Sequence, residues 1–263
     1  MRSTSVRPPA VAGMFYPGSS TDLARDVDDL LARAAVDVPA GASVPKAVIV
    51  PHAGYVYSGS TAALGFARLA AAADRITRVV LFGPCHRVAV RGLALPAAGA
   101  FRTPLGDVPI ALPDLADLPQ VVVSAAAHAA EHSLEVELPF LQRVLGDFEL
   151  VPFAVGEVGG EDVAEVVDRL WGGPETVLVF SSDLSHYHPY AEAQRLDRET
   201  VDRLLALRGP IAPERACGAR AVNGLLVSAA RRGLVTELYG LCNSGDTAGD
   251  KRRVVGYAAI GVG

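Results

Sequence analysis

Short apolar runs alternate along this chain with longer segments whose apolar residues recur at helical spacing. The short runs are rich in Val, Ile, Leu and Phe and end at Gly, Pro or Ser, which is typical of buried strands. These runs lie at residues 46–50, 78–83, 120–123, 148–155, 176–181, 235–242 and 254–262. The helical pattern occupies residues 20–35, 59–73, 131–145, 161–171, 189–207 and 213–232.

This alternation predicts one α/β domain over residues 1–263, with a mostly parallel or mixed central sheet covered by helices on both faces. No Ser- or Gly-rich linker divides the chain, and no internal repeat is visible. A stretch rich in Pro and Gly, residues 88–119, interrupts the alternation. Within it, FRTPLGDVPI is predicted to be an extended segment or a hairpin.

Three of the apolar runs are followed by a histidine. KAVIVPHAG carries His52, RVVLFGPCH carries His86, and TVLVFSSDLSH carries His186. Ligands of open α/β sheets bind in the crevice at the carboxyl ends of the strands. Three imidazoles that arrive there from distant parts of the sequence predict a metal site or an acid–base site. A histidine that only satisfies the core has no reason to recur at this place on three strands.

Composition narrows the function classes. Of 263 residues, 50% are apolar and 20% charged, and the net charge of −5 includes no basic stripe of the kind that binds nucleic acid. The N-terminus MRSTSVRPPAVAG has no apolar stretch of the kind found in a secretory signal, and no apolar segment of the chain is long enough for a membrane span. Three cysteines, Cys85, Cys217 and Cys242, form no CxxC pair. A cytoplasmic protein is therefore expected.

The motif SSDLSHYH supplies an acid–base candidate. Asp183 precedes His186 by three residues, close enough to meet it on one turn, to raise the imidazole pKa and to orient the ring. The alternative is that Asp183 caps the following helix. His188 is expected at the surface, and Cys85, next to His86, is expected to be an inert buried thiol rather than a ligand.

The segment HAAEHSLEVELPF contains His128, Glu131 and His132 at the spacing H-x-x-E-H, which resembles the inverted zinc-protease motif. That motif needs one helix over both histidines. Here VVVSAAAHAA predicts a strand that runs into a loop, with the helix starting near Glu131. A zinc hydrolase therefore stays a minor alternative. His132 and Glu135 are better placed as groups that support the site from a helix N-terminus.

A polar, Gly-rich loop, NSGDTAGD at residues 243–250, joins the last two strands. It could place Asp246 beside the histidines as a carboxylate ligand, or it could be only a solvated hairpin turn. The loop is not a phosphate-binding P-loop, because no GKS or GKT follows it.

In this order and spacing, the motifs PHAGYVYSG, GPCH, EHSLEVELPF, SSDLSHY and NSGDTAGD with VVGYAAI resemble the Memo family. The start RPPAVAGMFYP and the ACG at 216–218 match as well, so the resemblance covers essentially the whole chain. In bacteria and archaea, members of this family are the B component of the AmmeMemoRadiSam set. The resemblance thus implies cooperation with a radical SAM protein and an AMMECR-type protein.

The family's fold is similar to that of the class III extradiol dioxygenases of the LigB type. Those enzymes bind non-haem Fe(II) through two histidines and one glutamate, with a further histidine as acid or base. The resemblance implies that His52 and His86 are metal ligands and that His186 is the catalytic histidine. It makes His132 a second histidine that lines the site. The implied metal is Fe(II), with copper or zinc as alternatives.

The third ligand is where this chain departs from the dioxygenases, and in the animal Memo protein a cysteine falls in that region. The corresponding loop here offers Asp246 or Thr247, with Cys242 a few residues earlier. Asp246 would restore a set of two histidines and one carboxylate, which suits Fe(II). Thr247 would leave a weak site of two histidines.

Two classes of function follow. The first is a metal-dependent oxidoreductase, dioxygenase-like, in which the metal activates oxygen or a substrate. His186, oriented by Asp183, would then move protons, and His132 would hydrogen-bond the substrate. The second is a non-catalytic binding or assembly protein that reads a peptide or a modified residue in the same pocket. A carboxylate at position 246 favours the first class.

Overall fold

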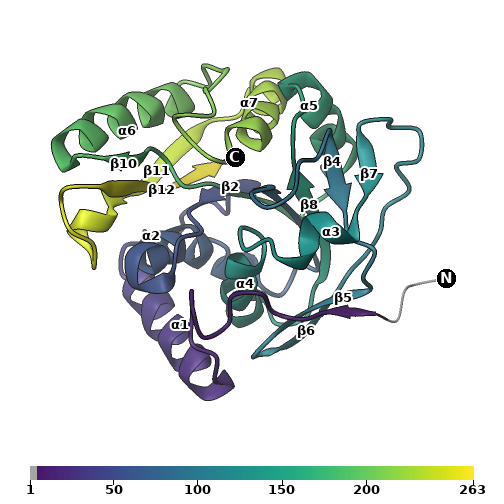
Figure 1. Ribbon diagram of the computed structural model, residues 1–263, viewed down its shortest axis with the longest axis horizontal. Helices are drawn as coiled ribbons and strands as arrows, with labels where there is room; N and C mark the ends of the chain where they lie inside the picture. Colours follow the sequence, from purple (N-terminus) through teal and green to yellow (C-terminus); the bar gives the residue numbers. More distant parts are fainter. Residues whose placement is uncertain (1–4) are drawn as a thin grey trace.

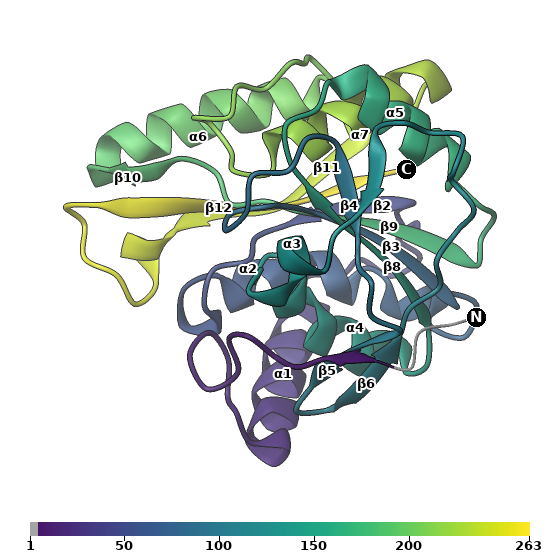
Figure 2. The same ribbon diagram turned by 45° about the vertical axis from the view of Figure 1, so that its right-hand side comes forward.

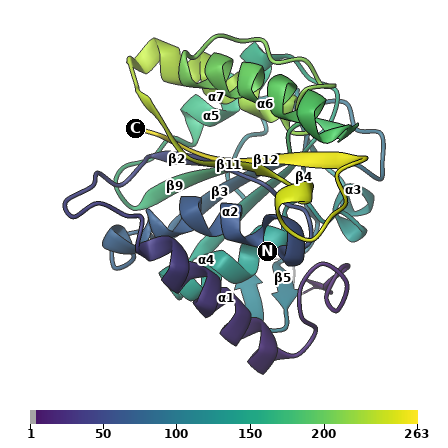
Figure 3. The ribbon, with the colours of Figure 1, turned by 90° about the vertical axis from the view of Figure 1, so that its left-hand side faces the viewer.

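The computed structural model describes residues 5–263 and consists of three layers (Figures 1 and 3). A mixed sheet of nine strands forms the middle layer. Helices α5, α6 and α7 cover one face of this sheet, and α1, α2 and α4 cover the other. The predicted α/β fold with helices on both faces is confirmed.

The helices range from one turn to about four turns in length. They are α1 (Ser20–Ala35), α2 (Tyr55–Ala67), α3 (Ala125–Ala129), α4 (Leu138–Leu145), α5 (Gly160–Arg169), α6 (Tyr190–Leu205) and α7 (Ala219–Arg232), with the 3₁₀ turns η1 (Ala70–Ala72), η2 (Glu135–Glu137) and η3 (Ser244–Asp246). Within residues 5–263, none of these helices has the length and apolar character needed to cross a membrane.

The strands of the large sheet are, in spatial order, β10 (His186–His188), β12 (Val254–Val262), β2 (Ala47–Val50), β9 (Thr176–Ser181), β3 (Arg78–Pro84), β8 (Glu149–Val155), β4 (Leu93–Leu95) and β7 (Val121–Val123). β11 (Thr236–Asn243) pairs with β12 outside this path. The central strands β2, β9, β3 and β8 are parallel neighbours, whereas β12 and β4 run antiparallel to β2 and β8.

The central strands are continuous apolar runs because both of their faces are covered. Along β2, Val48 and Val50 point into the core beneath α1, α2 and α4, whereas Ala47 and Ile49 point into the core beneath α5 and α7. This is the period-two alternation of a strand, and here both faces are buried. The parallel strands therefore place their carboxyl ends together at one edge of the sheet.

The N-terminal segment forms a second, smaller sheet. β1 (Val6–Arg7) pairs with β5 (Ala100–Thr103), which forms the predicted hairpin with β6 (Gly106–Pro109). Figure 2 shows this sheet beside α4, on the same side of the large sheet as α1. As a result, Arg7 is close to the chain segment that precedes α4.

Three predicted helices have clearly different bounds in the structure. The helix expected at 213–232 begins only at Ala219. The helix expected at 59–73 begins at Tyr55, directly after the turn that holds His52, and ends at Ala67. The helix expected at 131–145 does not start near Glu131. Residues 131–132 are irregular, residues 133–134 form a turn, and η2 follows. α4 begins only at Leu138, since Pro139 suits the first turn of a new helix.

Candidate metal centre

Parallel strand ends deliver the first side chains of the site. β2, β9 and β3 lie next to one another and run in the same direction. The chain leaves β2 through Pro51 into His52 and leaves β3 at Pro84, two residues before His86. Two histidines that are 34 residues apart in sequence, His52 and His86, therefore reach the same sheet edge.

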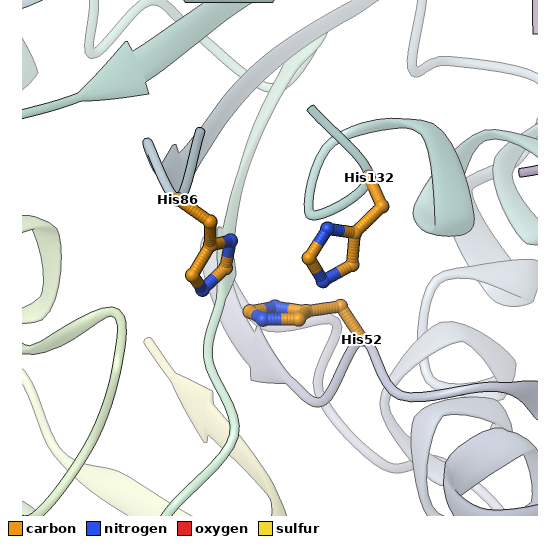
Figure 4. Close-up of side chains that lie close together, drawn as sticks. All are labelled: His52, His86 and His132. Atoms are coloured by element: carbon orange, nitrogen blue, oxygen red, sulfur yellow. The ribbon is translucent and has the colours of Figure 1, made fainter. Parts of the chain in front are cut away.

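A third imidazole, that of His132, completes the group. One ligand atom from each of His52, His86 and His132 lies within 4.8 Å of the other two. The ring centroids are 5.4 Å apart for His52 and His86, 5.4 Å for His52 and His132, and 4.7 Å for His86 and His132. Figure 4 shows the three rings gathered around one point. Among the described residues, this is the one group with the donor set of a metal site.

Burial keeps two of these imidazoles neutral. His52 is 1% exposed, and burial, followed by the nearby histidines, lowers its pKa well below the usual value. Burial also lowers the pKa of His132 to about 4. A neutral imidazole carries a lone pair on one nitrogen. At neutral pH both rings can therefore bind a cation without first losing a proton.

The buried carboxylate of Glu131 orients His86. One oxygen lies 2.9 Å from Nδ1 of His86, the other accepts the backbone N–H of His86, and Ser133 donates its N–H from 2.9 Å. Burial alone would raise the pKa of Glu131, but these hydrogen bonds lower it to about 2. The ionised carboxylate accepts the Nδ1 proton, so Nε2 of His86 is free for a metal. A carboxylate behind a ligating histidine is a recurrent feature of metal sites.

Asp183 and His186 reach the same site but do not pair with each other. Asp183 is buried and accepts the backbone N–H of His52 at 2.8 Å, and burial raises its pKa to about 7. His186 instead interacts with the backbone of Leu184. The expected pairing fails because residues 183–185 are not helical, so a spacing of three does not bring the two side chains together.

These groups line a cavity of about 800 Å³, the size of a small-molecule site. The lining includes His52, His86, His132, Asp183, His186, Tyr257, Phe15, Arg87, Arg252 and Arg253. The ring of Phe15 lies 4.9 Å from that of His132, and Tyr257 is buried. Near the surface, the guanidinium of Arg253 lies 4.9 Å from the ring of Tyr187. The cavity thus combines the histidines with aromatic and cationic side chains.

The structure does not bring Asp246 to the histidines. Its carboxylate accepts the backbone N–H of Asn243 in a capping box and the hydroxyl of Tyr190. Thr247 donates to the Ser244 carbonyl at 3.2 Å. The sequence NSGD forms the turn η3, and closing that turn uses the carboxylate that was expected to bind metal. The third nitrogen donor of the group comes from His132 instead.

Cys242 and Cys85 also lie outside the histidine group. The Cys242 thiol lies 3.0 Å from the Thr61 hydroxyl and borders a separate small pocket with Asp246. Cys85 donates to the Val88 carbonyl at 3.1 Å. Neither thiol shares the position of the three imidazoles.

The H-x-x-E-H motif is divided between two roles. α3 ends at Ala129, so His128 and His132 are not on one helix. His128 is buried and lies 2.8 Å, through Nε2, from the Ala94 carbonyl. The zinc-protease interpretation is therefore wrong for this motif. Two residues of the motif nonetheless belong to the histidine site, since His132 is one of the three imidazoles and Glu131 contacts Nδ1 of His86.

Sequence reasoning missed two groups that contact the ligands. The Ser181 hydroxyl lies 2.7 Å from Nδ1 of His52, and the Cys217 thiol lies 3.3 Å from its Nε2. Both belong to motifs that were noticed, SSD and ACG, but no local pattern shows what they face. Glu131 was noticed only as part of H-x-x-E-H, although its position next to His132 was a usable signal.

Comparison with known proteins agrees with the family resemblance of the sequence motifs. A family model described as Memo-like protein matches residues 7–261. A MEMO1 family protein of Methanopyrus kandleri is 37% identical over 97% of this chain and 98% of its own length. Those of Methanococcoides burtonii and Aquifex aeolicus are 37% and 35% identical over 97% of this chain, and over 99% and 98% of their own lengths.

Proposed function

This chain belongs to the Memo family, and from that premise we propose that it is a metal-dependent oxidoreductase whose ion is bound by His52, His86 and His132. The observation that carries the proposal is the set of three imidazole nitrogens within 4.8 Å of one another. Their position in the lining of a cavity of about 800 Å³ leaves room for a substrate.

The residues fit a divalent transition-metal ion. Three histidines with an open position are the donor set of catalytic zinc sites, and imidazole suits iron and copper as well. The carboxylate of Glu131 supports His86 from behind. A third histidine in place of a carboxylate removes the reason to rank Fe(II) first. We therefore propose Fe(II), copper or zinc on equal terms.

When bound, such an ion would supply a Lewis acid, and iron or copper would also exchange electrons with oxygen. The protein's own groups would move protons. His186 lines the cavity, and burial lowers its pKa, so it is neutral and able to accept a proton. Asp183, with a pKa of about 7, faces the same space. Phe15 and Tyr257 contribute aromatic surface to the same cavity.

Metal analysis of protein purified without a histidine tag tests the proposal. We expect about one ion per chain, with loss of the ion in His52→Ala and in His86→Ala. His188→Ala is the matched control, because this half-buried histidine lies outside the group. Added Zn²⁺ at 100 times its Kd should stabilise the parent and the control by about 2.7 kcal/mol. Unchanged metal content in both ligand variants would contradict the proposal.

Redox chemistry needs a separate measurement. Oxygen consumption in the presence of a reducing substrate should occur with iron- or copper-loaded protein and not with zinc-loaded protein, since Zn²⁺ has no accessible redox state. It should also be lost in His52→Ala. Equal consumption by the zinc-loaded protein would exclude a redox role for the ion.

The partners implied by the family resemblance form another part of the proposal. A radical SAM protein and an AMMECR-type protein from the same organism should be retained by the tagged chain when the three are expressed together. Retention of neither protein at a stoichiometric level would remove this part and leave the metal site unaffected.

A further inference from the structure

A second buried carboxyl group, that of Glu137, lies behind His52. Glu137 is fully buried on η2, and Oε1 lies 2.7 Å from the Ser181 hydroxyl. Its Oε2 has no hydrogen-bond partner among the described residues. Glu135, two residues earlier, is different, because it pairs with Arg7 and accepts three further hydrogen bonds. An ionised Glu137 would be a buried charge without a cation, which is strongly unfavourable.

The contacts of the Ser181 hydroxyl show which of its neighbouring groups must carry a proton. Its Oγ lies 2.7 Å from each of three atoms, which are Nδ1 of His52, Oε1 of Glu137 and the carbonyl oxygen of Ser133. Each contact needs one proton, and the hydroxyl supplies only one. A carbonyl oxygen can only accept, so the hydroxyl proton must be donated to Ser133. The other two contacts are hydrogen bonds only if His52 and Glu137 each donate to Oγ.

We propose that Glu137 is a protonated, neutral carboxylic acid that acts through Ser181 as a positioning residue, fixing His52 with its proton on Nδ1 and its lone pair on Nε2. Nε2 is then the atom that faces the metal. This inference rests on the proposed metal-binding role of His52.

Two further observations agree with this proton arrangement. Burial, followed by the nearby Asp183, raises the pKa of Glu137 well above its usual value. On the other side of the ring, the Cys217 sulfur lies 3.3 Å from Nε2, a contact in which the thiol can donate to the Nε2 lone pair while no metal is bound. The two ligating histidines are thus supported differently, His86 by an ionised carboxylate and His52 by a neutral acid.

Spectroscopy of the metal-free protein tests the protonation directly. The infrared difference between the parent and Glu137→Gln should contain the carbonyl stretch of a protonated carboxylic acid. The matched control is Glu135→Gln, whose difference spectrum should contain only carboxylate bands, because Glu135 is paired with Arg7. Nitrogen-15 spectra of the parent protein should show neutral His52 with its proton on Nδ1. Carboxylate bands alone for Glu137, or a proton on Nε2, would overturn the proposal.

Titration with Zn²⁺ tests the positioning role. Glu137→Gln should keep the Zn²⁺ affinity within about threefold, since the amide N–H₂ can donate to Ser181 as the acid does. Ser181→Ala should weaken Zn²⁺ binding 10–100-fold, as is typical for loss of an outer-shell partner. A loss of tenfold or more in a folded Glu137→Gln, or unchanged affinity in Ser181→Ala, would overturn the inference. Unchanged metal content in His52→Ala would instead refute the proposed function.

Discussion

At the scale of single residues, the site is defined by which nitrogen of each histidine is free. The Glu131 carboxylate contacts Nδ1 of His86, and the Ser181 hydroxyl contacts Nδ1 of His52. Burial keeps His52 and His132 neutral. One nitrogen of each of the three rings thus lies within 4.8 Å of the other two before any ion binds, which lowers the entropic cost of binding an ion.

The first prediction concerns the third ligand. His132→Ala should lose the metal ion, whereas Asp246→Ala should retain it within about twofold, because the Asp246 carboxylate is used within η3 and by Tyr190. Removal of one of three donors typically costs far more than an outer-shell change, which is about 10–100-fold. Equilibrium dialysis with Zn²⁺ measures both variants. The reverse order of losses would return the third position to Asp246.

The second prediction concerns proton transfer. His186→Gln should keep the metal ion, because His186 lies outside the group of three imidazoles. It should lower the turnover of any substrate that the metal-loaded protein converts by about 10²–10⁴-fold, the usual contribution of an acid or base. His188→Gln, two residues away, is the control. Activity of His186→Gln within a few-fold of the parent would rule out this role.

At the scale of elements, a clamp holds the segment that carries Glu131 and His132. Arg7 on β1 donates to the carbonyls of His128 and Glu131 and pairs with Glu135. Glu135 in turn accepts the hydroxyl of Tyr16 and the backbone N–H groups of residues 10 and 11. The N-terminal segment thereby fixes residues 128–135, which have little regular structure of their own.

The third prediction follows from this clamp. Arg7→Ala should lower the free energy of unfolding by about 3–5 kcal/mol, because it leaves the Glu135 carboxylate buried without its cation. Metal affinity should fall as well. The control is Arg102→Ala in the exposed Arg102–Asp107 pair, which should cost far less because solvent screens that pair. Chemical denaturation measures the free energy of unfolding of both variants. Equal losses would show that the buried pair stabilises the fold no more than the exposed pair does.

At the scale of the whole molecule, the site lies at one edge of a sheet that is covered by two separate cores. The apolar clusters on the two faces of the sheet contain most of the buried side chains and include none of the three histidines. The fold should therefore persist without metal. Its stability should still depend on pH through buried groups, since several histidines are kept neutral.

The fourth prediction concerns that pH dependence in metal-free protein. Burial lowers the pKa of His128 to about 4, below its ordinary value of 6.5. Between these values the unfolded chain binds the proton and the folded chain does not, so stability falls as pH decreases from 6.5 to about 4. His128→Gln should flatten this slope by up to about 1.4 kcal/mol per pH unit. Denaturation at several pH values measures it, and an unchanged slope would refute it.

The sequence by itself determined the local structure and the first candidates. Buried parallel strands are continuous apolar runs, so β2, β3 and β9 were recognisable, and with them the positions of His52 and His86 just after β2 and β3. His186 follows β9 by five residues and lies on the edge strand β10. The five motifs also indicated the family. The starts of two helices near the site were not predicted, because Tyr55 directly follows the turn that holds His52 and Leu138 directly follows the 3₁₀ turn η2.

Only the tertiary structure decided which donors meet. Asp246 and His132 both had suitable chemistry, but a ligand set depends on distances between segments far apart in sequence, and periodicity describes only neighbours. The protonation state of a buried group likewise depends on residues far away in the sequence. Whether Glu137 is charged depends on Ser181, 44 residues away, and on the absence of a cation near it among the described residues. Local patterns carry no information about such contacts, because folding brings the partners together.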